Sequence, residues 1–137
     1  MRMQAIIKPF EMDWTAIKRT APAWFRDAKF GLFFHWGPYS VPAYENEWYS
    51  RNMYMKGLSQ NLYHIKKYGK LSEFGYKDFY QHFTGKNFDA EAWAELIVAS
   101  GAKYAGPVAE HADNFSMWNS KVNPVNSVNY GPKRDVV

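Results

Sequence analysis

Cysteine is absent from this sequence, so disulfide bonds and thiolate metal sites are excluded. Long hydrophobic runs are also absent, since none approaches the roughly 18 apolar residues of a membrane-spanning helix. The start of the chain offers only the apolar pair Ile6-Ile7, whereas a signal peptide needs about 7–15 apolar residues. We therefore expect a soluble protein with no membrane partner and no signal peptide, cytoplasmic as the sequence is written.

Several well-known binding and catalytic motifs are missing too. The sequence has no glycine-rich nucleotide-binding motif of the GxGxxG or GxxxxGKS/T type, and no GxSxG nucleophile elbow. Its net charge is +4, but the basic residues are dispersed, with short pairs such as Lys66-Lys67 and Lys133-Arg134. This is a weak electrostatic footprint, so no nucleic-acid partner is expected.

Aromatic side chains, by contrast, are abundant: 6 Trp, 10 Tyr and 10 Phe make up 19% of the 137 residues. Hydrophobic residues account for 47% and charged residues for 22%. These values are ordinary for a folded domain and exclude wholesale disorder. Such an aromatic content suits a large core, or a ligand surface that stacks planar or sugar rings.

Two short apolar segments predict β-strands. Residues 29–36 are rich in aromatics and are closed by Gly37-Pro38, and residues 102–111 end in the ionisable pair Glu110-His111. Because polar residues do not alternate along them, both strands are predicted to be buried on both faces of a parallel sheet.

The connection between these strands contains helical patterns, predicted near residues 48–55, 59–68, 76–83 and 89–100. Asp89 is a suitable N-cap for the last of these helices, and Gly101 provides its left-handed stop. The order of strand, helices and strand predicts an α/β fold with a parallel sheet.

The two ends of the sequence are less regular. Residues 1–26 form a mixed lead-in segment, in which Trp14 and Ile17 are spaced to share one face of a short helix that Pro22 interrupts. Residues 132–137 have the composition of a helix start.

His35 and His111 stand at the carboxyl ends of the predicted strands, the edge that carries the active site in parallel α/β folds. A neutral imidazole donates and accepts hydrogen bonds at once, so the pair suits adjacent sugar hydroxyls or a reacting oxygen. Taken singly, each is more often explained as a core or capping histidine. The four histidines, at 35, 64, 82 and 111, lack HExxH or comparable spacing, so no metal is predicted.

Carboxylates lie near these histidines in two places. Segment 45–49 contains Glu47 and Trp48, which suit either a solvated loop with its tryptophan in the core, or a carboxylate and an indole that hold a sugar ring. Glu110 and Asp113 flank the second histidine. Paired carboxylates are the groups that glycosidic-bond cleavage uses.

Five segments together resemble the α-L-fucosidases of glycoside hydrolase family 29. The resemblance begins near residue 22, covers nearly all of the remaining chain, and lies in residues 28–43, 46–49, 88–104, 119–121 and 131–135. It implies part of a (β/α)8 TIM-type barrel, about the first two βα units. It further implies an enzyme that releases terminal α-L-fucose with retention and needs no metal and no cofactor.

The resemblance also implies four residues that contact the hydroxyls of fucose: His35, Glu47, Trp48 and His111. One position departs from the family pattern. Where the family usually has His-His-Asp-Gly-Phe, residues 111–115 read His-Ala-Asp-Asn-Phe. Ala112 therefore replaces a second histidine that often touches the sugar.

A complete barrel of this type takes about 250 residues. Residues 1–137 are therefore expected to be the N-terminal portion of the catalytic domain, with the nucleophile and the acid/base residue beyond Val137. The expected partners are a fucosylated oligosaccharide, the missing C-terminal part of the barrel, and a second copy in a homo-oligomer. The alternative is a fragment that binds carbohydrate or a partner without catalysis.

Overall fold

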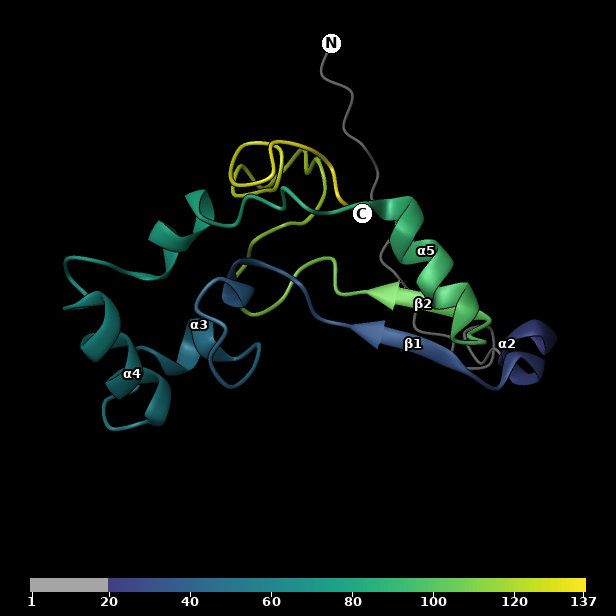
Figure 1. The fold of residues 1–137 in the computed structure, drawn as a ribbon, viewed down its shortest axis with the longest axis horizontal. Coiled ribbons are helices and arrows are strands. Elements are labelled where there is room, and N and C mark those ends of the chain that lie inside the picture. The colour runs from purple at the N-terminus through teal and green to yellow at the C-terminus, as the bar shows by residue number, and fades with distance from the viewer. Residues whose placement is uncertain (1–19) are drawn as a thin grey trace, which may run out of the picture.

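The computed structural model describes residues 20–137 and shows two parallel strands with short helices (Figure 1). The expected helix face at Trp14 and Ile17 lies outside the described residues. The predicted α/β class is confirmed. In chain order, with η for a 3-10 helix, the elements are α2 (Ala23–Ala28), β1 (Gly31–Phe34), η1 (Pro38–Ser40), α3 (Tyr49–Asn52), α4 (Ser59–Tyr68), η2 (Tyr76–Gln81), α5 (Ala90–Ala99) and β2 (Tyr104–Pro107).

The two strands pair in parallel, from Gly31 opposite Tyr104 to Phe34 opposite Pro107. Pairing continues past the strand ends, where the Val108 N–H donates to the Phe34 carbonyl at 3.0 Å. Gly31 allows the Tyr104 ring to lie against the backbone of β1, because a Cβ at position 31 would clash with that ring. The carboxyl ends of both strands therefore lie side by side at one edge (Figure 1).

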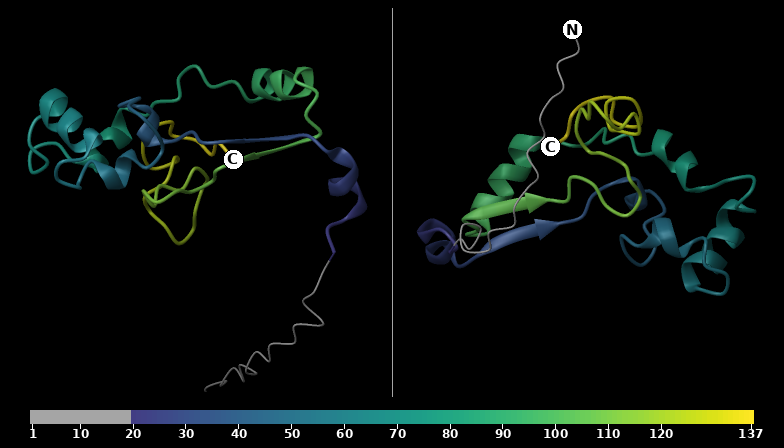
Figure 2. Two further views of the ribbon diagram at one scale, coloured as in Figure 1. Left: turned by 90° about the horizontal axis from the view of Figure 1, so that it is seen from below. Right: turned by 180° about the vertical axis from the view of Figure 1, so that it is seen from behind.

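Helix α5 covers one face of this pair of strands (Figure 2). The rings of Phe34 and Trp93 lie 5.5 Å apart across that contact. The prediction that both faces are buried is wrong for the described residues, since the Phe33 side chain is 72% exposed. The physical reason is that none of the elements within residues 20–137 packs over the face opposite α5.

The ends of α5 follow the local signals. The Asp89 carboxylate accepts hydrogen bonds from the backbone N–H groups of Glu91 and Ala92, at 3.0 and 3.1 Å. Gly101, with φ of 84°, takes the left-handed conformation that ends a helix. Both predictions are confirmed.

Pro22 precedes α2, and its carbonyl accepts from the N–H groups of Phe25 and Arg26. The helix that Pro22 was predicted to interrupt lies largely outside the described residues, so this prediction is not tested. The C-terminal end differs from expectation. The predicted helix start at 132–137 is wrong. Asp135 instead uses its carboxylate to accept from the Asn119 N–H at 2.9 Å, which fixes the segment to a neighbouring loop.

A helical lobe, formed by η1, α3, α4 and η2, lies beyond the carboxyl ends of the strands (Figure 1). Predicted helix 59–68 is confirmed as α4, whereas 48–55 is the shorter α3 and 76–83 is the 3-10 helix η2. The buried centre of the lobe is aromatic and consists of Tyr39, Tyr49, Met53, Tyr76 and Phe79. Much of the aromatic content thus fills a core outside the sheet.

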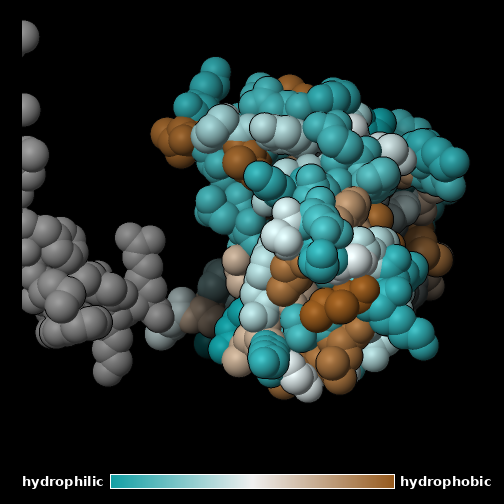
Figure 3. Space-filling view, turned by 90° about the vertical axis from the view of Figure 1, so that its left-hand side faces the viewer, coloured by the Kyte–Doolittle hydropathy of each residue, from teal (hydrophilic) through white to brown (hydrophobic). Residues whose placement is uncertain are grey.

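A second buried cluster joins the lobe to the C-terminal loops through Phe83, Phe115 and Met117. The outer face of the lobe is mainly hydrophilic with separate hydrophobic patches (Figure 3), and α4 contributes the exposed Leu62 and Ile65. Within residues 20–137, every helix is too short or too polar to cross a membrane.

Candidate functional site

The structure brings His35 and His111 together at the carboxyl edge of the strands. His35 directly follows β1, and His111 lies in the loop after β2. Their rings meet edge to face, with 5.0 Å between centroids and an angle of 79°. The loop is closed by the N–H of Met117, which donates to the Ala109 carbonyl at 2.8 Å. His111 is therefore held on a short, anchored loop.

Glu47 and Trp48 join the two histidines from the loop before α3. One nitrogen each from His35 and His111 and one Glu47 oxygen lie within 4.8 Å of one another, and all three residues are half-buried. The Trp48 ring lies 4.9 Å from the His111 ring and is 44% exposed. The four predicted sugar contacts thus lie in one place.

The turn before α3 fixes the positions of Glu47 and Trp48. The side chain of Asn46 accepts from the Trp48 N–H at 3.1 Å, and its carbonyl accepts from the Tyr49 N–H at the same distance. Beside the turn lies an open hollow of about 420 Å³, lined by His35, Tyr39, Ser40, Ala43, Tyr44, Glu45, Asn46 and Glu47. The lining combines hydrogen-bonding groups with aromatic surface, as small polar ligands require.

Both site histidines retain unused hydrogen-bonding capacity. Nδ1 of His35 and Nδ1 of His111 are buried without a partner among the described residues. His64, buried in the lobe, is different, because its ring bonds the Tyr49 hydroxyl at 3.0 Å and the Phe74 carbonyl at 2.8 Å. Buried polar atoms are nearly always paired in folded proteins, so each of these rings keeps one nitrogen whose hydrogen-bonding capacity the described residues do not use.

Tyr39 is a site residue that sequence analysis missed. It is 7% exposed, and its ring lies 6.4 Å from the His35 ring and 5.9 Å from the His111 ring. Burial raises the pKa of its hydroxyl, and the carboxylates of Asp113 and Glu47 raise it further. Tyr39 therefore stays a neutral phenol that can donate a hydrogen bond. Its position just after the Gly37-Pro38 turn was the available signal.

Asp113 anchors the loop that carries His111. Its carboxylate accepts from the Tyr76 hydroxyl at 2.7 Å and from the Phe115 N–H at 3.2 Å. Burial raises the pKa of Asp113, against the opposing effects of these two hydrogen bonds and of nearby His111. Asp113 thus connects the core of the lobe to the site, and Ala112 beside it is exposed.

The other two carboxylates near the site are occupied. Glu45 accepts hydrogen bonds from the side chains of Ser59 and Gln60 at the start of α4, and Glu110 accepts one from the Ser116 hydroxyl. These contacts assign both groups to loop structure. Among the carboxylates of segments 45–49 and 110–113, only Glu47 belongs to the histidine cluster.

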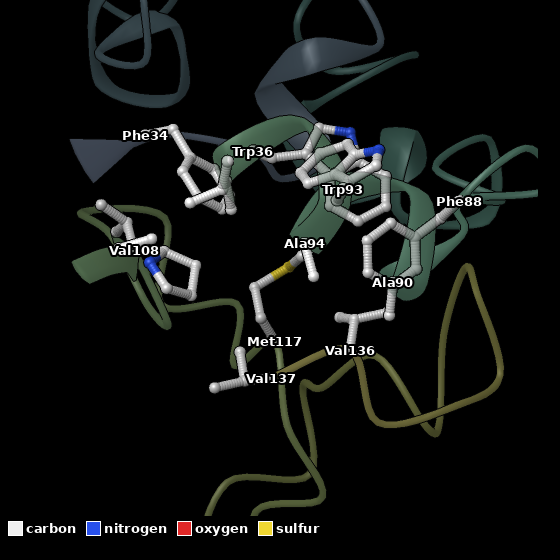
Figure 4. A pocket seen from close by; sticks show the side chains of 13 residues that line it. Phe34, Trp36, Phe88, Ala90, Trp93, Ala94, Val108, Met117, Val136 and Val137 are labelled. Carbon is white, nitrogen blue, oxygen red and sulfur yellow. The ribbon is translucent and has the colours of Figure 1, made fainter. Parts of the chain in front are cut away.

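A separate apolar cavity of about 190 Å³ lies between the sheet, α5 and the C-terminal segment (Figure 4). Aromatic side chains such as Phe34, Trp36 and Trp93 face Met117 and Val136 across it. None of its lining side chains is titratable. It belongs to the packing of α5 on the strands and offers no chemistry.

Two histidines, a carboxylate and an exposed indole at the carboxyl edge of parallel strands form a polar ligand site of the kind that α/β proteins carry at this edge. A sequence model of the α-L-fucosidase family matches residues 2–137. The chain belongs to the α-L-fucosidase family, which confirms the resemblance found in its sequence.

Named relatives agree with this assignment. Human plasma α-L-fucosidase is 38% identical over 130 residues, with 93% of this chain and 28% of that protein covered. Rat tissue α-L-fucosidase is 42% identical over 128 residues, with 91% and 27% covered. The solved Thermotoga maritima α-fucosidase superposes with a TM-score of 0.85 at 40% identity, over 90% of this chain and 32% of that one. The chain thus spans about three tenths of the length of these relatives.

Proposed function

We propose that this chain is the sugar-binding portion of an α-L-fucosidase, a retaining exo-glycosidase that releases terminal α-L-fucose from glycans. In this proposal, β1 and β2 with their helices are about the first two βα units of a (β/α)8 barrel. Family membership supports the substrate class, and the Thermotoga maritima relative has been solved in complex with fucose. The observation that carries the proposal is the convergence of His35, Glu47, Trp48 and His111.

The chemistry of the four groups matches a sugar ring with neighbouring hydroxyls. The imidazoles donate and accept hydrogen bonds, and the Glu47 carboxylate accepts from two neighbouring hydroxyls. The exposed Trp48 ring offers a flat apolar surface to the C–H face of the sugar. The buried Tyr39 adds a neutral hydroxyl beside both imidazoles.

Hydrolysis needs more than this site offers. A retaining glycosidase uses two carboxyl groups about 5–5.5 Å apart, one as nucleophile and one as acid/base. Glu45, Glu110 and Asp113 already serve the structure of the loops, and Glu47 is assigned to sugar hydroxyls. We therefore assign no residue of this chain as nucleophile or acid, and place both in later barrel strands beyond Val137.

Binding and hydrolysis are tested separately. Ligand-observed NMR with L-fucose should show binding to the chain that His35→Ala and His111→Ala each weaken more than tenfold. A lost hydrogen bond contributes about 0.5–1.5 kcal/mol, and the unpaired hydroxyls and misplaced ring add to this. The matched control is His82→Ala, an exposed histidine outside the cluster, which should leave binding unchanged. Equal binding by parent and cluster variants would refute the proposed site.

Hydrolysis is tested with an aryl α-L-fucoside as the substrate. The chain alone should show no turnover above background, because neither catalytic carboxylate is assigned to it. Addition of a C-terminal portion from a relative should restore turnover. If fucose binds but no such complement restores hydrolysis, the chain is a carbohydrate-binding fragment without catalysis. Steady turnover by the chain alone would overturn the assignment of the catalytic pair to later strands.

A further inference from the structure

The histidine cluster has a second chemical capacity. His35, Glu47 and His111 come from three separate loops, and one donor atom from each lies within 4.8 Å of the other two. Two imidazoles and one carboxylate are the ligand set of three-ligand zinc sites that keep a fourth position open. Sequence spacing did not predict this, because no two of these residues share a helix.

The geometry is close to that of a metal site. Zinc binds histidine nitrogen and carboxylate oxygen at about 2.0–2.2 Å, so tetrahedral ligand atoms lie about 3.4 Å apart. The separations of up to 4.8 Å within the cluster must therefore shrink by at most about 1.4 Å. Glu47 can supply most of this movement, because it is half-buried on a loop and has a flexible side chain.

The surroundings favour a cation. The hollow beside the cluster has no lysine or arginine among its described lining residues. Nδ1 of each site histidine lacks a hydrogen-bond partner within residues 20–137, so reorienting either ring for a metal breaks no bond at that atom.

We propose that His35, Glu47 and His111 bind a divalent transition-metal ion such as Zn²⁺, and that this ion excludes the sugar. The metal-binding part rests on the cluster alone. The inhibitory part rests on the proposed function, because the same three side chains would otherwise contact fucose. The ion is an inhibitor here and supplies no chemistry to hydrolysis.

Ligand chemistry sets the selectivity. Imidazole nitrogen suits Zn²⁺, Co²⁺ and Cu²⁺, whereas Mg²⁺ prefers oxygen ligands in near-octahedral geometry. Zn²⁺ and Co²⁺ should therefore bind to the cluster, and Mg²⁺ should not.

The test is isothermal titration calorimetry of the 137-residue chain with zinc chloride, with magnesium chloride as the reference salt. We expect one zinc ion per chain and no heat from magnesium. Glu47→Gln and His111→Gln should each weaken zinc binding more than tenfold, whereas the matched control His82→Gln should bind as the parent does. Far-ultraviolet circular dichroism of each variant verifies that its helices are retained.

Cobalt provides a readout that needs no variant. Co²⁺ added to the parent chain should give the strong visible absorption of a four-coordinate site, and Zn²⁺ should abolish it. Absence of stoichiometric zinc binding, or equal weakening by His82→Gln, would overturn the metal site. A zinc titration in the presence of L-fucose tests the inhibitory part of the proposal. Fucose should weaken zinc binding, and zinc binding that fucose leaves unchanged would overturn the inhibitory part and count against the sugar site while retaining the metal site.

Discussion

Asp113 links the buried core to the candidate site through a single side chain. It accepts from the Tyr76 hydroxyl inside the lobe and stands two residues after His111. Burial disfavours its charged form, whereas the hydrogen bond from Tyr76 favours it. The position of His111 therefore depends on a carboxylate whose ionisation the fold penalises.

Tyr76→Phe should raise the pKa of Asp113 further, because it removes the largest opposing contribution, the hydrogen bond from the Tyr76 hydroxyl. A pH titration of the side-chain carboxyl carbons by NMR measures this directly. In the parent, Asp113 should titrate above the ordinary value of about 3.9. Exposed Asp27 provides the internal control. An Asp113 midpoint that Tyr76→Phe leaves unchanged or lowers would contradict this account.

The raised pKa of Asp113 sets the direction in which the stability of the fold changes with pH. A carboxyl group whose pKa is higher in the folded chain favours folding in its protonated form. This contribution is complete below about pH 3.9 and is lost as the pH rises through the folded-state pKa. Ionisation of Asp113 should therefore lower the free energy of unfolding of the chain as the pH rises.

At this scale, sequence predicted some site residues and missed others. His35 and His111 are each placed by a local pattern, the end of an apolar strand, so their meeting followed from parallel pairing. Glu47 and Trp48 were noted as a carboxylate and an indole suited to a sugar ring, and the family resemblance implied their contact with fucose. Tyr39 was missed, because its role depends on ring contacts with both histidines and on burial that only tertiary packing creates.

Helix α5 depends on its cap. Asp89→Ala should destabilise the helix by about 1 kcal/mol, within the range of about 0.5–2 kcal/mol for a lost N-cap. The reason is that two backbone N–H groups lose their acceptor. Far-ultraviolet circular dichroism during thermal unfolding measures the change. Glu95→Ala, an exposed substitution on the same helix, serves as the control.

An Asp89→Ala variant that unfolds at the same temperature as the Glu95→Ala control would show that Asp89 contributes nothing to α5. Asp89→Asn should retain most of the stability, because an amide oxygen still accepts from the backbone.

Local signals explain which elements could be predicted. The boundaries of α5 follow from its Asp89 cap and its glycine stop, and α4 ends at Gly69, so these signals lie within a few residues of the helices. The burial of the strands and the fate of residues 132–137 depend on distant partners. Phe33 is exposed because no described element covers it, and Asp135 bonds a loop instead of starting a helix.

The whole molecule carries large apolar side chains on its surface. Phe33 on β1 is 72% exposed, and Leu96 and Val98 on α5 are 71% and 73% exposed. In the proposed barrel, further strands and helices would pack against these positions. In the chain alone, these exposed side chains occur together with two unpaired strand edges, and such edges are themselves prone to association.

The chain on its own should therefore self-associate or be marginally stable. Sedimentation velocity should show concentration-dependent association, and near-ultraviolet circular dichroism should show weak aromatic bands. Phe33→Ser combined with Leu96→Ser should reduce the association, because both side chains are exposed and their replacement leaves the buried clusters untouched. A single monomeric boundary with strong aromatic bands and cooperative unfolding would instead show that the chain is a self-sufficient domain.

The separation between the helical lobe and the sheet has a consequence for the order of folding. Contacts in the lobe join residues close in sequence, such as Tyr49 and His64, which are 15 positions apart. The strands pair Gly31 with Tyr104 across more than half of the chain. Short loops close at a smaller entropic cost than long ones. The lobe should form early, with Tyr39 and Tyr76 already in place, and the ligand site should be complete only when β2 brings His111 to it.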